Sequence, residues 1–97
     1  MKKINLSTKA LKEAANCLKI LSHPVRLQII QLLIEKKRSV WEIAKLCAIP
    51  HNLASTHLKV MERCKFLESS RIGKNVYYQV IETHLEDLLC CIEKRFS

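Results

Sequence analysis

Hydrophobic residues recur at helical spacing near the start of the chain. Within residues 8–21 the apolar positions form two adjacent rows: Leu11, Ala14, Ala15 and Leu18, and Ala10, Ala14, Cys17 and Leu21. The spacing predicts a helix, with Ser7 or Thr8 as its cap. Because two adjacent rows are broader than the face one neighbouring helix usually covers, we expect part of this surface to form an interface.

Three further helices are predicted before the first strand. Pro24 suits the first turn of a second helix, which would reach about Glu35. Ser39-Val40-Trp41-Glu42 has the spacing of a capping box and predicts the start of a third helix, which ends at Pro50. A fourth helix follows, to about Cys64.

Beyond residue 64 the pattern changes to that of a hairpin. Leu67–Arg71 and Asn75–Val80 are predicted strands, and Gly73, the only glycine, supplies the positive φ that a tight turn needs. Thr83-His84-Leu85-Glu86 has capping-box spacing and predicts a last helix to about Phe96. The apolar stripe of that helix has helical spacing: Leu85, Leu88, Leu89, Ile92 and Phe96.

These elements predict a mainly α fold with a small β-hairpin. Their order is α-α-α-α-β-β-α, a winged helix-turn-helix with five helices and one wing. Two helices separated by a few residues can place the second in a DNA major groove, and a basic hairpin can touch the phosphate backbone. We therefore expect residues 1–97 to form a single winged-helix domain that binds DNA.

The charge balance agrees with a polyanionic partner. The chain carries 17 Lys and Arg against 9 Asp and Glu, a formal net charge of +8. A solvated basic surface would be the simpler explanation. It is less satisfactory because Lys59, Arg63, Arg71 and Lys74 cluster in and around the predicted fourth helix and hairpin.

Nothing in the sequence predicts a membrane partner or export. No apolar run approaches the roughly 18–20 residues that span a bilayer, and Lys2 and Lys3 are not followed by a signal-peptide core. Five cysteines, an odd number without a regular framework, indicate reduced thiols. We therefore expect a cytoplasmic protein.

The predicted recognition helix, about residues 51–64, has one polar face. Asn can read adenine with two hydrogen bonds, Ser and Thr can bond a base edge or a phosphate, and Lys suits phosphate. The wing, residues 71–75, is expected on the backbone. The candidate DNA-binding residues are His51, Asn52, Ser55, Thr56, His57 and Lys59 on the helix, and Arg71, Lys74 and Asn75 on the wing. The alternative is an ordinary amphipathic surface helix.

From about Ala15 to Phe96 the chain resembles the ArsR/SmtB-type winged-helix repressors. The resemblance implies a homodimer built on the first and last helices, about residues 8–21 and 83–96. It also implies that the dimer binds a palindromic operator and represses transcription until an inducer binds. Four segments carry it, in the family's order: Leu18-Lys19-Ile20-Leu21-Ser22-His23-Pro24-Val25-Arg26-Leu27, Ser39-Val40-Trp41-Glu42-Ile43-Ala44, Ala54-Ser55-Thr56-His57-Leu58 and Gly73-Lys74-Asn75-Val76-Tyr77-Tyr78.

Two positions depart from the family's pattern near the recognition helix. Pro50 replaces the usual Ser, so a side-chain cap is expected to be lost. Lys65 replaces the usual Gly, and a left-handed turn kept there would carry strain of about 1 kcal/mol. Neither departure is expected to disturb the fold.

The resemblance also locates the family's inducer sites, and these are incomplete. Ser39 and Trp41 stand where the thiolate metal site has a Cys-x-Cys pair. Glu82 and His84 keep half of the family's zinc site, but Arg95 replaces the distal His, and a guanidinium cannot ligate zinc. Cysteines of sulfide- and oxidant-sensing members are replaced as well, by Gln31 and Ser97. No metal site is therefore expected.

The adjacent Cys90 and Cys91 remain as candidate sensing residues. They diverge by about 100° on a helix, so they do not readily form a disulfide with each other. With Cys17, which the dimer would bring near, they could bind arsenite or another thiophilic ligand, or be oxidised. We expect Cys90 to be accessible and Cys91 to flank the stripe. The alternative is that these cysteines only pack; Cys47 and Cys64 are expected to be structural.

Three functions are compatible with these observations. The first is a repressor released from its operator by a thiol-reactive signal, namely arsenite, an oxidant or reactive sulfur. The second is a winged-helix regulator with no small-molecule inducer, acting constitutively or through a protein partner. The third is an interaction module that does not bind DNA, which the basic wing argues against. We expect neither a required cofactor nor an enzyme, because no nucleophile–base–orienter set and no glycine-rich phosphate loop is evident.

Overall fold

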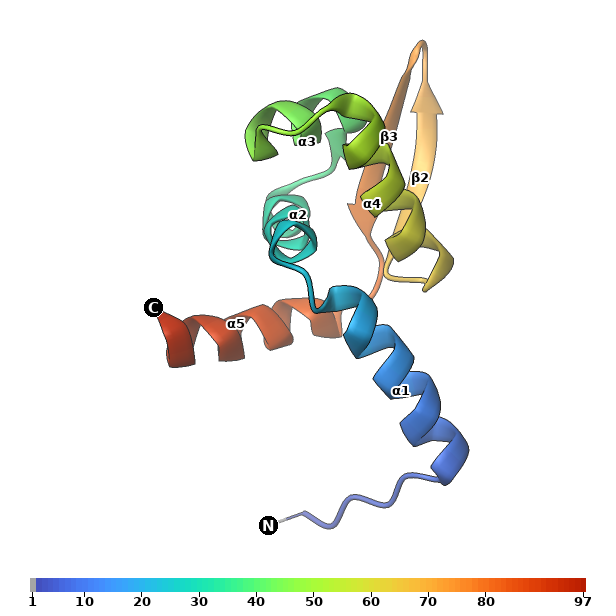
Figure 1. Ribbon diagram of the computed structural model, residues 1–97, viewed down its shortest axis with the longest axis vertical. Helices are drawn as coiled ribbons and strands as arrows, with labels where there is room; N and C mark the ends of the chain where they lie inside the picture. The colour runs from blue at the N-terminus through green and yellow to red at the C-terminus, as the bar shows by residue number, and fades with distance from the viewer. Residues whose placement is uncertain (1) are drawn as a thin grey trace.

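The computed structural model describes residues 2–97 and confirms the predicted fold class. The helices and strands follow in this order: α1 (Thr8–Leu21), α2 (Pro24–Glu35), β1 (Arg38–Ser39), α3 (Val40–Cys47), α4 (His51–Arg63), β2 (Leu67–Ile72), β3 (Asn75–Val80) and α5 (His84–Phe96). The terminal helices α1 and α5 diverge from one end of the molecule, and the β2–β3 hairpin projects from the other (Figure 1).

The sheet has three antiparallel strands in the order β1-β3-β2, one strand more than the sequence pattern predicts. Strand β1 pairs Arg38 with Tyr78 and Ser39 with Tyr77. At two residues it is too short to show an alternating pattern, so it could not be predicted from the sequence. It ties the segment before α3 to the base of the wing.

Two of the three helix caps predicted from the sequence, at Ser7 and Ser39, are confirmed. The Ser7 hydroxyl accepts from the Ala10 N–H at 3.1 Å. At α3 the capping box is complete: the Ser39 hydroxyl accepts from the Glu42 N–H at 3.1 Å, and Glu42 Oε1 accepts from the Ser39 N–H at 3.0 Å. That backbone donor holds the pKa of Glu42 below its usual value.

The capping box predicted at Thr83 is wrong. Thr83 already has helical dihedrals, φ −65° and ψ −24°, and its side chain makes no cap hydrogen bond. The side-chain acceptor at the start of α5 is instead the Glu82 carboxylate, whose Oε1 accepts from the His84 N–H at 3.2 Å.

Two left-handed residues shape the ends of α3 and α4. Lys65 has φ 68°, so the turn after α4 keeps the strained conformation that the sequence led us to expect. Ala48 ends α3 with φ 54°, a second left-handed residue that the sequence did not indicate. Pro50 leaves α4 without a side-chain cap, as expected. The turn between the two helices therefore depends on backbone hydrogen bonds.

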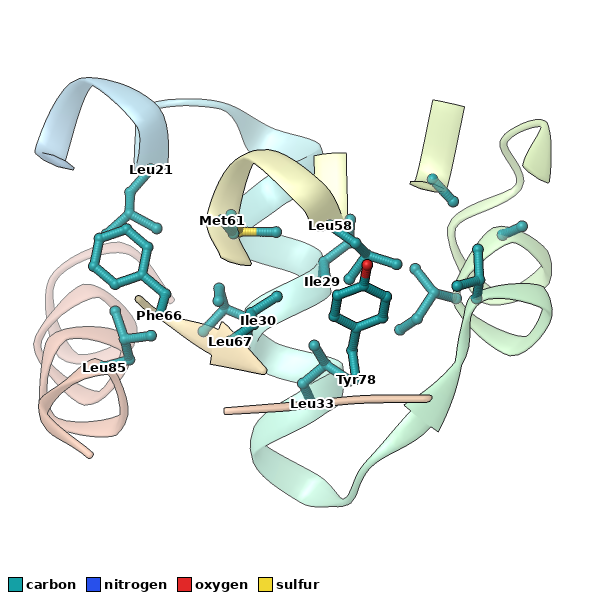
Figure 2. Packing of buried hydrophobic residues seen from close by; sticks show 14 residues of the cluster. Leu21, Ile29, Ile30, Leu33, Leu58, Met61, Phe66, Leu67, Tyr78 and Leu85 are labelled. Carbon is teal, nitrogen blue, oxygen red and sulfur yellow. The ribbon is translucent and has the colours of Figure 1, made fainter. Parts of the chain in front are cut away.

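The hydrophobic core is built around α2 and includes side chains from the other four helices and from the hairpin. Ile29, Ile30 and Leu33 of α2 are buried, and Leu58 and Met61 of α4 are fully buried against them. Figure 2 shows the Phe66 ring lying between Leu21 of α1 and Leu85 of α5. Leu21 and Leu85 are the only buried residues of their helices. Each terminal helix is thus anchored at one end and leaves the rest of its apolar face uncovered.

In the part of the chain that the structure describes, no single helix is long and apolar enough to cross a membrane. Helices α1 and α2 pass that test only as a pair, by length and composition, and are bent by 90° where they meet.

Candidate nucleic-acid interface

Helix α4 is held by one buried face and presents two polar rows. Ala54, Leu58 and Met61 have no exposed surface. One polar row, Asn52 and Thr56, is exposed to solvent. The second, with a spacing of four residues, is His51, Ser55 and Lys59, and it faces the wing. The opposite side of the helix is fixed in the core, so both rows are available to a ligand.

The Asn52 row suits contact with base edges. The Thr56 hydroxyl donates to the Asn52 carbonyl at 2.9 Å, a bond within the helix that leaves the oxygen lone pairs as acceptors. The Asn52 amide is exposed and offers both a donor and an acceptor, the combination that an adenine edge matches.

The wing presents its polar residues at the tip of the β2–β3 hairpin. Its register runs from Leu67 opposite Val80 to Ile72 opposite Asn75, and Gly73 in the turn has φ 62°. The predicted wing contacts Arg71, Lys74 and Asn75 are all exposed. The tip therefore carries two cations with no packing role that would withhold them from DNA.

A carboxylate that the sequence did not single out ties the recognition helix to the wing. Glu62 Oε2 accepts from the Ser69 hydroxyl at 2.7 Å, and Glu62 Oε1 accepts from the Tyr78 hydroxyl at 3.3 Å. Burial, followed by the Glu62 charge, raises the pKa of Tyr78 above its ordinary value. The partners lie 7 and 16 residues along the chain, so no local pattern could have identified the link.

His57 is the one candidate DNA-binding residue that the structure removes from the exposed surface. It is buried, with 6% of its surface exposed. Its Nδ1 accepts from the Arg26 Nε–H at 3.0 Å, and its ring meets His23 edge-on at 4.8 Å. Burial, then the charges of Arg26 and His23, lowers the pKa of His57. The expectation that its side chain reaches DNA is therefore corrected: it joins α4 to α2.

Arg26 extends that junction. Its guanidinium Nη1–H donates to the Ile20 carbonyl at 3.1 Å, near the end of α1. One arginine of α2 thus bonds both to the recognition helix and to the terminal helix α1.

The candidate sensing cysteines are not gathered in one subunit. Cys90 and Cys91 are both exposed, and Cys90 lines a groove of 640 Å³ between α2 and α5. Cys17 is half-buried, and burial, followed by the Cys17 thiol, raises the pKa of Cys64. Cys64, expected to be only structural, therefore has a thiol neighbour that the sequence did not indicate.

Residues 2–97 contain no cluster of three or more His, Cys, Asp or Glu arranged to hold a metal. Glu82 and His84 form an exposed pair at the start of α5, with His84 Nδ1 2.7 Å from Glu82 Oε1. The hydrogen bond raises the pKa of His84 and lowers that of Glu82. The pair starts the helix.

Comparison with known proteins agrees with this geometry. A helix-turn-helix domain model matches residues 21–70. The biofilm growth-associated repressor of Xylella fastidiosa is 35% identical over 81 residues, which cover 84% of this chain and 71% of that repressor. The transcriptional repressor SmtB of Mycobacterium tuberculosis is 32% identical over 79 residues, 81% of this chain, and the match spans 58% of its length.

A solved structure shows the same architecture. The homodimeric winged helix-turn-helix DNA-binding domain of a possible ArsR-family regulator from Mycobacterium bovis superposes with a TM-score of 0.79 at 25% identity, covering 96% of this chain and 86% of that one. The fold, with its exposed helix and basic wing, defines a winged helix-turn-helix protein. The chain belongs to the ArsR/SmtB family of winged-helix repressors, which confirms the resemblance inferred from its motifs.

Proposed function

We propose that this protein is a homodimeric transcriptional repressor that binds a palindromic DNA operator. The observation that carries the proposal is that α4 exposes Asn52 and Thr56 and packs beside a wing whose tip carries Arg71 and Lys74. The helix would enter the major groove and contact base edges, and the wing would lie on the phosphate backbone. The role is binding alone and requires neither an enzymatic step nor a cofactor.

The dimer is proposed on the uncovered apolar surface of the terminal helices. Leu11 and Leu18 of α1 are 53% and 58% exposed, and Phe96 of α5 is 75% exposed. A second copy would cover these side chains, and the related Mycobacterium bovis domain is homodimeric. Twofold symmetry then calls for an operator with two inverted half-sites, roughly 34–36 Å apart.

The signal proposed for release is thiol-reactive. Cys90 and Cys91 are exposed on the helix assigned to the dimer interface. Arsenite bound by these thiolates, with Cys17 of the other subunit as a third ligand, would change how the subunits pack. A peroxide could instead oxidise two thiols to a disulfide while being reduced to water. The free cysteines suit the reducing cytoplasm, where we place the protein.

The test is an operator-binding measurement on the reduced protein, repeated with arsenite, zinc, sulfane sulfur and peroxide. We expect one thiol-reactive agent to release the protein and zinc to have no effect. The double variant Cys90→Ser/Cys91→Ser should bind the operator normally and no longer respond, with Cys47→Ser as a control that keeps the response. A double variant that still responds to every agent would show that this pair only packs.

One observation favours a second function, that of a regulator without a small-molecule inducer. The described residues hold no three-ligand metal cluster, and neither Ser39 nor Trp41 can ligate a soft metal where family members have cysteines. A regulator without a small-molecule inducer, acting constitutively or through a protein partner, would bind the operator in the presence of all four agents.

A further inference from the structure

A small crevice lies between the recognition helix and the wing. It has a volume of 230 Å³ and is lined from three elements: Val40 and Trp41 of α3, the α4 row His51, Ser55 and Lys59, and Lys74, Asn75, Val76 and Tyr78 of the wing. Two lysines, one on each side, are its charged residues, and no carboxylate is among the lining side chains. The charge and the polar lining suit an anionic group.

Trp41 is one of the residues that line this crevice. It is the only tryptophan of the chain and is 62% exposed, so most of its large apolar surface is left in water. Its ring lies 4.0 Å from that of His51, centroid to centroid, at an angle of 39°. Because Trp41 is in the first turn of α3 and His51 begins α4, this tilted ring contact places the indole beside the recognition helix.

Duplex geometry determines what must pass over the crevice. The major groove, which would hold α4, is separated from the neighbouring minor groove by a single sugar–phosphate strand. A wing that touches DNA beside the groove occupied by its own helix therefore lies across that strand from the helix. The crevice between α4 and the wing is the space that faces the intervening backbone.

We propose that this crevice holds one phosphodiester group of that strand, between Lys59 and Lys74, with the Trp41 indole packed against the adjoining sugar. The inference rests on the DNA-binding function proposed above and adds Trp41 as a contact residue. It also divides the polar face of α4: the Asn52 row contacts bases, and the His51, Ser55 and Lys59 row contacts the backbone. Contacts in the crevice are therefore independent of sequence.

The emission of Trp41 tests the proposal directly, since no other tryptophan contributes. The full chain is titrated at low salt with short duplexes of two unrelated sequences, and binding is measured independently by the anisotropy of a labelled duplex. We expect a saturable change in Trp41 emission with the same midpoint as binding, for both sequences. Inorganic phosphate at equal ionic strength should leave the emission unchanged; an equal response would indicate a site for a free anion and overturn the assignment to the backbone.

Substitutions give a second readout. Lys59→Ala and Lys74→Ala should each weaken binding of every duplex and reduce the slope of log Kobs against log[salt] by about 1. Trp41→Ala should weaken binding by roughly threefold to tenfold, equally for all sequences and with an unchanged salt slope, and Trp41→Phe should recover part of the loss. Thermal unfolding of each variant checks that the fold is intact.

Leu46→Ala is the matched control, because Leu46 lies on the same helix, is 48% exposed and does not line the crevice. It should bind as the parent does. If the parent binds duplex while Trp41 emission stays constant, or if Trp41→Ala binds normally, the crevice is not a backbone site although the protein still binds DNA. If the parent binds no duplex at all, the proposed function itself fails.

Discussion

At the scale of single residues, polar side chains on α4 divide into those that face solvent and one that faces the core. Asn52 and His57 both belong to the polar pattern of the helix, yet Asn52 is exposed and His57 is buried against Arg26 and His23. Helical spacing alone cannot separate the two cases. Arg26 lies 31 residues before His57, so the partner that draws the imidazole inward is visible only in the fold.

Asn52→Ala should weaken operator binding by about 1–3 kcal/mol, because a base edge loses two hydrogen bonds. Binding to a scrambled duplex should hardly change. Lys74→Ala serves as the contrasting variant, since the loss of a phosphate contact lowers affinity for both duplexes. An equal loss on the two duplexes from Asn52→Ala would show that the base-contacting row has been assigned to the wrong residue.

His57 should make the stability of the protein depend on pH. Burial, then Arg26 and His23, lowers its pKa in the folded state, so the unfolded chain takes up the proton first. Its contribution to the free energy of unfolding is therefore present above the ordinary pKa of about 6.5 and is lost as the pH falls through the folded value. Protonation also removes the lone pair that accepts from Arg26.

Denaturant unfolding at a series of pH values tests this. His57→Gln keeps an acceptor but does not titrate, so it should lose less stability than the parent as the pH is lowered. His84 contributes in the opposite sense, because its raised pKa favours the folded state at low pH, but it is present in both proteins and cancels in the comparison. Parallel stability curves for the two proteins would exclude His57 as the source.

At the scale of elements, the sequence predicts those helices and strands whose formation depends on residues close together along the chain. All five helices and the hairpin follow from apolar spacing, from Ser39 as a cap and from Gly73 in a turn. Strand β1 and the Thr83 cap are the failures. Two residues of β1 carry no period, and Thr83 already has helical dihedrals and makes no cap hydrogen bond. The Glu62 link joins α4 to two strands and has no local signature at all.

Glu62→Ala should destabilise the fold by about 1–3 kcal/mol, because the buried Tyr78 hydroxyl loses its acceptor. Urea unfolding measures the loss. Glu62→Gln retains an acceptor oxygen and should fall between the parent and the alanine variant. A Glu62→Ala protein as stable as the parent would mean that another group or water satisfies Tyr78.

At the scale of the whole molecule, the wing tip and the start of α1 lie at opposite ends of the long axis (Figure 1). Helix α1 extends away from the wing along the long axis, and α5 extends sideways near the middle of that axis (Figure 1). Both carry exposed apolar residues, and neither contributes a candidate DNA contact. The proposed dimer interface and the proposed DNA contacts thus lie on different elements of one small domain, as binding to an operator with two half-sites would require.

Leu18→Glu should convert the dimer to a monomer, because it places a charge in the apolar face of α1 that a second copy would cover. Leu18 is 58% exposed in the single chain, so the fold should survive. Sedimentation equilibrium measures the change, and Leu46→Glu, at a position on α3 that is 48% exposed, should remain dimeric. Dimerisation of the Leu18→Glu protein at the parent's concentration would move the interface away from α1.

The bonds from Glu62 to Ser69 and Tyr78 make the recognition helix and the wing a single rigid body. An inducer of the kind proposed above would therefore act by changing the angle between the two subunits rather than the shape of either one. The molecule is 48 Å in its longest dimension, so a tilt of roughly 10° at the dimer helices would displace the wing by at most about 8 Å, against a rise of about 3.4 Å for one base pair. A rigid link between the recognition helix and the wing would thus turn a small rearrangement at the dimer helices into a mismatch with the operator.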